Sequence, residues 1–434
     1  MDYGRVNKLS VFRKLATGDN VTVGVLAQNS QGIYFQYDTS YLEQYHNLSP
    51  FNLSFDSTLQ LAPVQPHNRL HGAFSDSLPD GWGLLLMDRV FRQVNTLPAQ
   101  ITAMDRLSFV GEGAMGALSY LPISELQKNN VEEQLSIAQL GLQAQAIFDG
   151  QTSEVLQALI HAGSSGGARP KAQLYLNDKN DKNDFCSTSA SDDTEAFLVK
   201  FTSSQLSLGH DEGVCEAAYL TMAKQAGIDV PKWRLLDAPA ASGAQQWLAV
   251  KRFDVVKNQH GNEGRLHLHS ASGLLDADYR MPSLDYEDLI KASAIICRSP
   301  AAGQVMFRRM VFNLFALNQD DHSKNWAFLQ PDSGQWQLAP FYDVTFSPSS
   351  HSEHATAFCG FGKQPSLKVM QKLAGQANFA SWEQAQLVID EVVEAVQSFT
   401  RIANELTINP DVARLINKQL DSTYFENKLL LQKK

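Results

Sequence analysis

The chain has 434 residues, enough for two or three globular domains at roughly 150 residues each, and its 44% hydrophobic content is ordinary for globular proteins. Its formal net charge of -10 argues against a stand-alone nucleic-acid binder, because neutralising phosphates requires clustered lysine and arginine. No stretch approaches the roughly 18 consecutive apolar residues of a membrane helix, and no apolar segment follows a basic start at the N-terminus. We therefore expect a cytoplasmic protein with no membrane partner.

The first third of the chain predicts short strands followed by a helix. Residues 20–65 contain V-T-V-G-V-L and G-I-Y-F-Q-Y, which indicate a small β-rich N-terminal subdomain. Further along, Asp80 and Gly81 predict a turn, and the apolar run from Trp82 predicts the start of a helix.

A glycine-rich stretch, G-S-S-G-G-A-R-P-K, extends from Gly163 to Lys171. Glycine-rich runs bring backbone N–H groups close to phosphates. Ala168 and Arg169 stand where a Walker A loop needs Lys and then Ser or Thr, and a strand-like A-Q-L-Y-L follows instead of a helix. A glycine loop leading into a strand is typical of kinases, where it covers ATP. A flexible surface linker remains the alternative.

The next elements predict a second cation and its partner. Residues 177–194 are polar and short of apolar side chains, which indicates a mobile loop. Lys200 ends the apolar strand E-A-F-L-V-K-F, and kinases pair such a strand lysine with a helix glutamate, for which Glu216 is the candidate. The alternative is an edge-strand lysine and a solvated glutamate.

Another apolar strand, W-L-A-V-K-R-F-D, follows from Trp247 to Asp254. Its position after the Glu216 helix predicts a hinge that offers backbone groups to adenine, although Lys251 could compete with Lys200 for the phosphates. From Met281 onward the pattern becomes helical. Phe307, Val311, Leu314 and Phe315 fall on one face of a predicted helix. A β-rich start, a mixed middle and a helical end predict an α+β fold.

The stretch N-Q-D-D-H-S-K-N places Asp320 and Asn325 five positions apart. This D-x-x-x-x-N spacing is that of the kinase catalytic loop, in which the aspartate accepts the hydroxyl proton and the asparagine binds Mg²⁺. Asp321 keeps the choice of base open by one residue. A predicted hairpin then leads to Asp343, a second Mg²⁺ ligand, and Lys324 is placed to neutralise phosphoryl charge.

A zinc or metallonuclease site is a competing interpretation of the same D-D-H cluster, with His351 and His354 as further ligands. Those histidines lie in a polar stretch, so we expect them to be solvated. The cysteines are Cys186, Cys215, Cys297 and Cys359. They form no C-x-x-C pair, and we expect isolated reduced thiols.

Together these motifs resemble those of the HipA family, serine/threonine-kinase-like toxins of bacterial toxin–antitoxin pairs. The resemblance covers nearly the whole chain. It rests on F-S-D-S-L-P-D-G-W-G near Phe74, F-V-G-E-G-A-M-G-A-L near Phe109, S-S-G-G-A-R-P-K, the N-x-D-x-H-x-K-N loop and Y-D-V. It implies a two-lobed, protein-kinase-like α+β fold: a β-rich subdomain (1–150), a nucleotide-binding lobe (151–255) and a helical lobe (256–434).

The resemblance also implies roles for individual residues, with ATP and Mg²⁺ as cofactors. Asp320 would be the base, His322 and Lys324 would lie beside the phosphates, and Asn325 and Asp343 would hold Mg²⁺. Lys200 would contact phosphates, and Lys251, Arg252 and Phe253 would meet adenine. The nucleotide-binding loop would comprise Gly166, Gly167, Ala168, Arg169, Pro170 and Lys171. Autophosphorylation is expected at Ser164, with Ser165 as the alternative, and would expel this loop because it adds about -1.5 to -2 charges.

Partners follow from the same resemblance. It implies phosphorylation of a translation-related protein such as an aminoacyl-tRNA synthetase, with growth arrest and persistence as consequences. It also implies a HipB-like helix-turn-helix antitoxin that binds operator DNA and supplies the phosphate contacts this acidic chain lacks. The competing hypotheses are a catalytically weak corepressor subunit bound to that antitoxin, and a small-molecule phosphotransferase.

Overall fold

The computed structural model describes residues 5–127, 135–152, 159–160, 166–177 and 185–432. Ser164, Ser165 and residues 178–184 of the predicted loop lie outside this part. Within it, no helix is both long enough and apolar enough to cross a bilayer. All four cysteines belong to the described residues and are unpaired.

The first sheet is antiparallel and five-stranded, in the order β4-β3-β2-β1-β5. Its strands are β1 (Lys8–Lys14), β2 (Asn20–Gln28), β3 (Ile33–Tyr37), β4 (Gln60–Leu61) and β5 (Leu118–Leu121). Alternate residues of β1 are buried, so the sheet turns one face to a core shared with three helices: α1 (Thr39–Gln44), α2 (Gly72–Ser75) and α4 (Ala103–Val110). The strands predicted within residues 20–65 are confirmed.

The second sheet has four strands in the order β10-β11-β9-β7. They are β7 (Lys171–Asn177), β9 (Thr194–Lys200), β10 (Trp233–Asp237) and β11 (Gln246–Lys251). One face packs against α3 (Gly81–Gln93) and α5 (Ile137–Phe148), and the other packs against α7 (Glu212–Gln225). The predicted helix is α3, which begins at Gly81, one residue before the predicted start at Trp82. The boundaries near residues 150 and 255 stay a prediction.

One part of the predicted loop 177–194 is in fact a strand. Residues Phe185–Cys186 form β8, which pairs with β6 (Leu135–Ser136). Cys186 is buried and its thiol donates to the Leu135 carbonyl at 3.5 Å. This strand partner lies far away in the sequence, so the local polar composition could not predict it.

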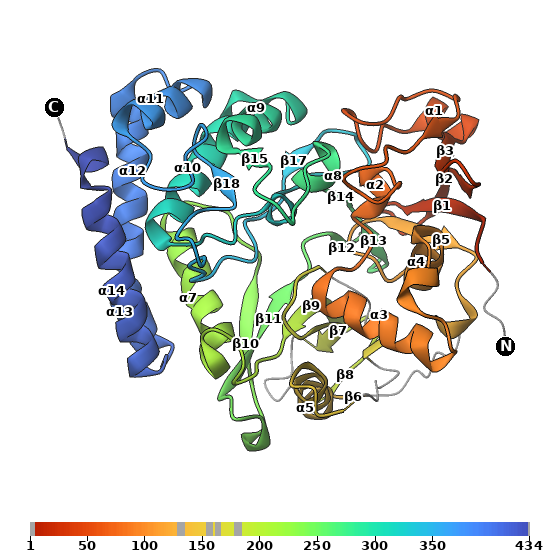
Figure 1. Ribbon diagram of the computed structural model, residues 1–434, viewed down its shortest axis with the longest axis horizontal. Coiled ribbons are helices and arrows are strands. Elements are labelled where there is room, and N and C mark those ends of the chain that lie inside the picture. Colours follow the sequence, from red (N-terminus) through yellow and green to blue (C-terminus); the bar gives the residue numbers. More distant parts are fainter. Residues whose placement is uncertain (1–4, 128–134, 153–158, 161–165, 178–184, 433–434) are drawn as a thin grey trace.

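The C-terminal part is a helical bundle. It contains α9 (Tyr286–Ile296), α10 (Pro300–Ala316), α11 (Leu367–Gln376), α12 (Trp382–Gln397), α13 (Phe399–Glu405) and α14 (Pro410–Glu426). Phe307 and Val311 of α10 are buried as predicted, but so are Met310 and Phe312, because α10 is the central helix and is enclosed on most of its surface. Figure 1 shows the first sheet and this bundle at opposite ends, with the second sheet between them. The α+β prediction is confirmed.

Short elements connect these parts. The strands are β12 (Val255–Lys257), β13 (Glu263–Arg265), β14 (His267–Ser270), β15 (Leu284–Asp285), β16 (Ala327–Gln330), β17 (Gln337–Leu338) and β18 (Thr356–Ala357), and α8 spans Ala271–Leu274. The 3₁₀ turns are η1 (Pro98–Gln100), η2 (Glu125–Gln127), η3 (Gly209–Asp211), η4 (Ala240–Ser242), η5 (Ser323–Asn325) and η6 (Lys428–Leu431). Strands β16 and β17 form the predicted hairpin.

Candidate active site

A cavity lies where the second sheet, the C-terminal part and the N-terminal part meet. Most of the predicted site residues line it: Gly166, Gly167, Lys171, Lys200, Lys251, Arg252, Phe253, His322, Lys324, Asn325 and Asp343. Of the other predicted residues, Ala168, Arg169, Pro170 and Asp320 lie outside the lining. Residues separated by nearly 180 positions in the sequence thus share one pocket.

Lys200 and Glu216 are in contact at the floor of this cavity. Lys200 ends β9, an inner strand, so the edge-strand alternative is wrong. Its Nζ lies 2.6 and 2.7 Å from the two carboxylate oxygens of Glu216 and 2.6 Å from Oδ1 of Asp343. Burial alone would lower the pKa of Lys200, but these two carboxylates raise it above its usual value. The lysine is therefore a buried, permanently charged group.

Asp343 is held as an anion by three cations. Burial would raise its pKa, but Lys200, Lys171 and Arg169 together hold the pKa well below its usual range. Its backbone has a φ of +56°, a left-handed conformation that a non-glycine residue adopts at some cost. Asp343 thus lines the cavity in a backbone conformation that is unfavourable for a non-glycine residue.

The described part of the glycine-rich loop is stabilised by Lys171. Its Nζ donates to the Gly166 carbonyl at 2.7 Å, and burial lowers the pKa of Lys171 to about 8. Gly167 has a φ of +100°, and a Cβ there would overlap the Lys171 ammonium. Arg169 lies 3.3 Å from Glu212, and Phe201 donates its N–H to the Pro170 carbonyl at 2.9 Å. The loop enters strand β7, as predicted.

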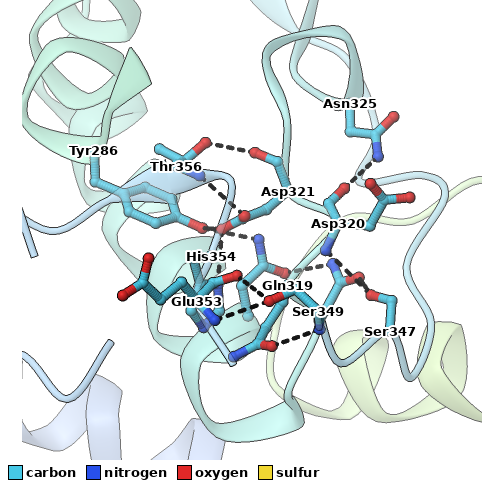
Figure 2. Close-up of polar contacts among 12 residues, drawn as sticks. Tyr286, Gln319, Asp320, Asp321, Asn325, Ser347, Ser349, Glu353, His354 and Thr356 are labelled. Carbon is cyan, nitrogen blue, oxygen red and sulfur yellow. Dashed lines mark hydrogen bonds and ion pairs between the residues drawn. The ribbon is translucent and has the colours of Figure 1, made fainter. Parts of the chain in front are cut away.

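Asp320 and Asp321 have opposite environments (Figure 2). Oδ2 of Asp321 accepts from the Tyr286 hydroxyl and lies 2.9 Å from Nδ1 of His354, while its Oδ1 accepts from the Thr356 N–H at 3.1 Å. Asp321 is 1% exposed, so both its oxygens are committed to the protein.

The side chain of Asp320 is 61% exposed, with Nε2 of His322 3.8 Å away. Its backbone is fixed from both sides, because its N–H donates to the Ser347 hydroxyl at 3.2 Å and its carbonyl accepts from Asn325 at 2.7 Å. The protein packed behind the carboxylate raises its pKa, His322 partly offsets that rise, and the charge of Asp343 adds to it. Only Asp320 of the two is free to accept a proton from another molecule.

The side chain of Lys324 contacts two residues outside its own loop, Asp80 and Tyr279. Its Nζ lies 2.9 Å from Oδ2 of Asp80 and 4.5 Å above the ring of Tyr279. His322 also packs against Tyr279, with ring centroids 5.9 Å apart. The aromatic ring therefore supports two polar residues of the loop.

The predicted hinge residues, Lys251, Arg252 and Phe253, also line the cavity. Lys251 pairs with Glu195, and Phe253 packs against Tyr342 with ring centroids 5.4 Å apart. The Arg252 guanidinium is buried and forms an ion pair with Asp254, whose carboxylate also accepts from the Gly116 N–H at 2.6 Å. Contact of these residues with adenine stays a prediction.

Four lining residues from the N-terminal part were not predicted to belong to the site: Asp76, Leu78, Asp80 and Met115. The two aspartates belong to F-S-D-S-L-P-D-G-W-G, in which Asp80 was interpreted as a turn residue only. The sequence signal that could have assigned them to the site was a pair of carboxylates four positions apart, the second followed by a glycine.

The donor atoms fit Mg²⁺ better than zinc. The described residues contain no cluster of three His, Cys, Asp or Glu side chains that could hold a metal ion. His351 is exposed as expected, but the expectation for His354 is wrong, because its contact with Asp321 buries it. Asp343 offers carboxylate oxygens, and Asn325 uses its amide nitrogen on the Asp320 carbonyl, which leaves its oxygen. Oxygen ligands completed by water and phosphate are what Mg²⁺ prefers.

Models of two protein-family domains match the chain. The HipA-like C-terminal domain matches residues 163–399, more than half of the chain, and the HipA N-terminal domain matches residues 16–121.

Curated relatives match over shorter stretches. Y4dM of Sinorhizobium fredii (strain NBRC 101917 / NGR234), provisionally named a kinase, is 27% identical over 274 residues, which is 60% of this chain and 63% of that protein. A Haemophilus influenzae protein with the same provisional name is 28% identical over 141 residues, 31% of this chain and 41% of that protein. The chain thus spans less than two thirds of either relative.

A solved structure shares the fold. HipA of Shewanella oneidensis MR-1, in complex with HipB and its operator DNA, matches with a TM-score of 0.69 at 17% identity. The match covers 96% of this chain and 97% of that one.

Proposed function

This chain belongs to the HipA family, and from that premise we propose that it is an ATP- and Mg²⁺-dependent serine/threonine-protein kinase. The observation that supports the proposal most is the cavity in which the Lys200–Glu216 pair, Asp343 and the glycine-rich loop meet next to Asp320. The provisional naming of two curated relatives as kinases supports the same class of reaction.

Asp320 is the general base in this proposal. Its carboxylate is exposed and its pKa is raised, so it is a better proton acceptor for a substrate hydroxyl than an ordinary aspartate. His322 lies beside it and Asn325 fixes its backbone. Asp321 holds the loop in place through its contacts with His354 and Thr356, and in this proposal it takes no part in proton transfer.

Cations of the chain bind and orient the phosphates. Lys200 and Lys171 line the cavity from the sheet side, together with Gly166 and Gly167, and Lys324 lines it from the loop that carries Asp320. Lys324 is placed to stabilise the charge that develops on the transferred group. Asp343 and Asn325 would hold Mg²⁺, which supplies further neutralisation of phosphate charge when bound.

The biological role follows the family. We propose a toxin that phosphorylates a translation-related protein, such as an aminoacyl-tRNA synthetase, and that modifies its own Ser164 or Ser165. The partner is a HipB-like helix-turn-helix antitoxin, and the net charge of -10 supports indirect binding to operator DNA through that partner. The HipA structure of matching fold was solved with HipB and operator DNA.

The alternative is a catalytically weak corepressor subunit. Expression of the wild-type chain in a bacterial host, alongside Asp320→Asn, separates the two. The kinase proposal expects growth arrest and new phosphoserine or phosphothreonine on a translation-related protein with the wild type, and neither with Asp320→Asn. Equal growth and equal phosphoproteomes for the two would transfer support to the corepressor.

A further inference from the structure

The first part of the chain extends into the candidate active site. The segment Gly72–Trp82, which we call the connector, leaves the first sheet and is anchored in the C-terminal part through Asp76. Oδ2 of Asp76 lies 2.6 Å from Nδ1 of His269 and accepts from the Ser270 N–H at 2.7 Å, and its Oδ1 accepts from the Ser270 hydroxyl at 2.6 Å. Gly72 packs so closely on Gly273 that a Cβ at residue 72 would overlap the Gly273 carbonyl.

Four residues after this anchor, Asp80 joins two loops that both line the cavity. Its Oδ1 accepts from the N–H of Gly167 in the glycine-rich loop, and its Oδ2 lies 2.9 Å from Nζ of Lys324. Burial would raise the pKa of Asp80, but Lys324 and these hydrogen bonds hold it below its usual value, so the carboxylate is ionised. Hydrogen bonds to a charged group are the stronger kind.

The next two residues add a second, backbone contact. The N–H of Trp82 donates to the Gly167 carbonyl at 3.0 Å, and its indole Nε1 donates to the Lys171 carbonyl at 2.9 Å. Gly81 has a φ of +39°, and a Cβ there would lie 2.7 Å from Cα of Ala168 and from the Gly167 carbonyl oxygen. No other residue type fits this approach without displacing the loop.

We propose that Asp80 is a positioning residue, through which the N-terminal part fixes the glycine-rich loop and Lys324 relative to each other for phosphoryl transfer. This inference rests on the proposed function, because it assigns the consequence to that reaction. It gives the N-terminal part a role in positioning the residues of the candidate active site, and it explains the composition of the D-G-W turn.

The test compares Asp80→Ala and Asp80→Asn in the full-length chain with Asp88→Asn as the matched control. Asp88 lies in α3, the helix that follows Asp80 directly, and pairs with Arg106 at 2.8 Å, outside the cavity lining. Two quantities are measured: hydrogen exchange of the backbone amides of residues 166–171, and steady-state kinetics of phosphoryl transfer from Mg²⁺-ATP. The asparagine variant keeps an oxygen acceptor for the Gly167 N–H and removes the negatively charged acceptor for Lys324.

Asp80→Ala is expected to speed exchange in the loop and to lower kcat/KM for ATP by roughly 10- to 100-fold, the range for losing a hydrogen bond to a charged group. Asp80→Asn is expected to leave loop exchange near the wild-type rate while kcat falls. Asp88→Asn should change neither. Unchanged loop exchange in Asp80→Ala, or faster exchange with unchanged kinetics, would overturn the inference.

The exchange measurement also separates this inference from the proposed function. If the wild type transfers no phosphoryl group, the kinase proposal fails, but faster exchange of residues 166–171 in Asp80→Ala would still support the loop contact. If Asp80→Ala does not fold, Asp80→Asn decides alone, because lower kcat with normal loop exchange supports the inference and wild-type kcat overturns it.

Discussion

Asp320 and Asp321 are adjacent, yet the structure predicts that replacing them has opposite consequences. In Asp321→Asn, the amide nitrogen would replace an oxygen that now faces the Tyr286 hydroxyl and His354. Two buried polar contacts would be lost or reversed, each at about 1–3 kcal/mol, so the free energy of unfolding should fall by roughly 2–6 kcal/mol. Asp320→Asn removes an exposed carboxylate and should change that free energy by less than about 0.5 kcal/mol.

Activity should behave the other way. Loss of a general base lowers turnover by about 10²- to 10⁴-fold, so Asp320→Asn should be folded and nearly inactive. Asp321→Asn should retain measurable turnover at temperatures where it is still folded. Stability is measured by urea unfolding, monitored by tryptophan fluorescence, and phosphoryl transfer is measured on the same preparations. A stable but inactive Asp321→Asn, together with an active Asp320→Asn, would refute the assignment of the base.

Three further predictions concern the cavity of the candidate active site. Gly167→Ala should raise the KM for ATP at least about tenfold in steady-state kinetics, because its φ of +100° and the Lys171 ammonium leave no room for a Cβ. The control is Gly150→Ala, which should leave the KM unchanged, because this glycine has a φ of +73° but open space around it. Burial lowers the pKa of Lys171 to about 8, so this side chain loses its charge as the pH rises through that value. Calorimetric titration should therefore show weaker Mg²⁺-ATP binding above a pH of about 8, and Lys171→Arg should abolish this pH dependence. Asp343→Asn should raise the Mg²⁺ concentration that gives half-maximal turnover by roughly tenfold, with Mg²⁺ titrated at fixed ATP; an unchanged value would contradict its role as a ligand.

The motifs with short spacing were accessible from the sequence because local geometry determines them. Asp320 and Asn325 are five positions apart and meet through one hydrogen bond, and the hairpin that leads to Asp343 follows from its turn residues. The contact between Lys200 and Glu216, which are 16 positions apart, forms because α7 packs on the sheet that contains the preceding strand, β9.

Contacts between distant segments were not accessible in the same way. Asp80 is 244 positions from Lys324 and 87 from Gly167, so no local pattern distinguishes it from an ordinary turn aspartate. His354 lies in a polar stretch that predicts exposure, and only its contact with Asp321, 33 positions earlier, buries it. Such residues depend on how the parts of the chain pack, which composition and periodicity do not encode.

The central claim is that the cavity beside Asp320 transfers a phosphoryl group from ATP. The most direct measurement starts from protein shown by intact mass to carry no phosphate, and incubates it with γ-labelled ATP and Mg²⁺ alongside Asp320→Asn. The proposed kinase activity predicts label in the wild type that mass spectrometry maps to Ser164 or Ser165, and none in the variant. Absence of label in the wild type, or equal label in both, would contradict it.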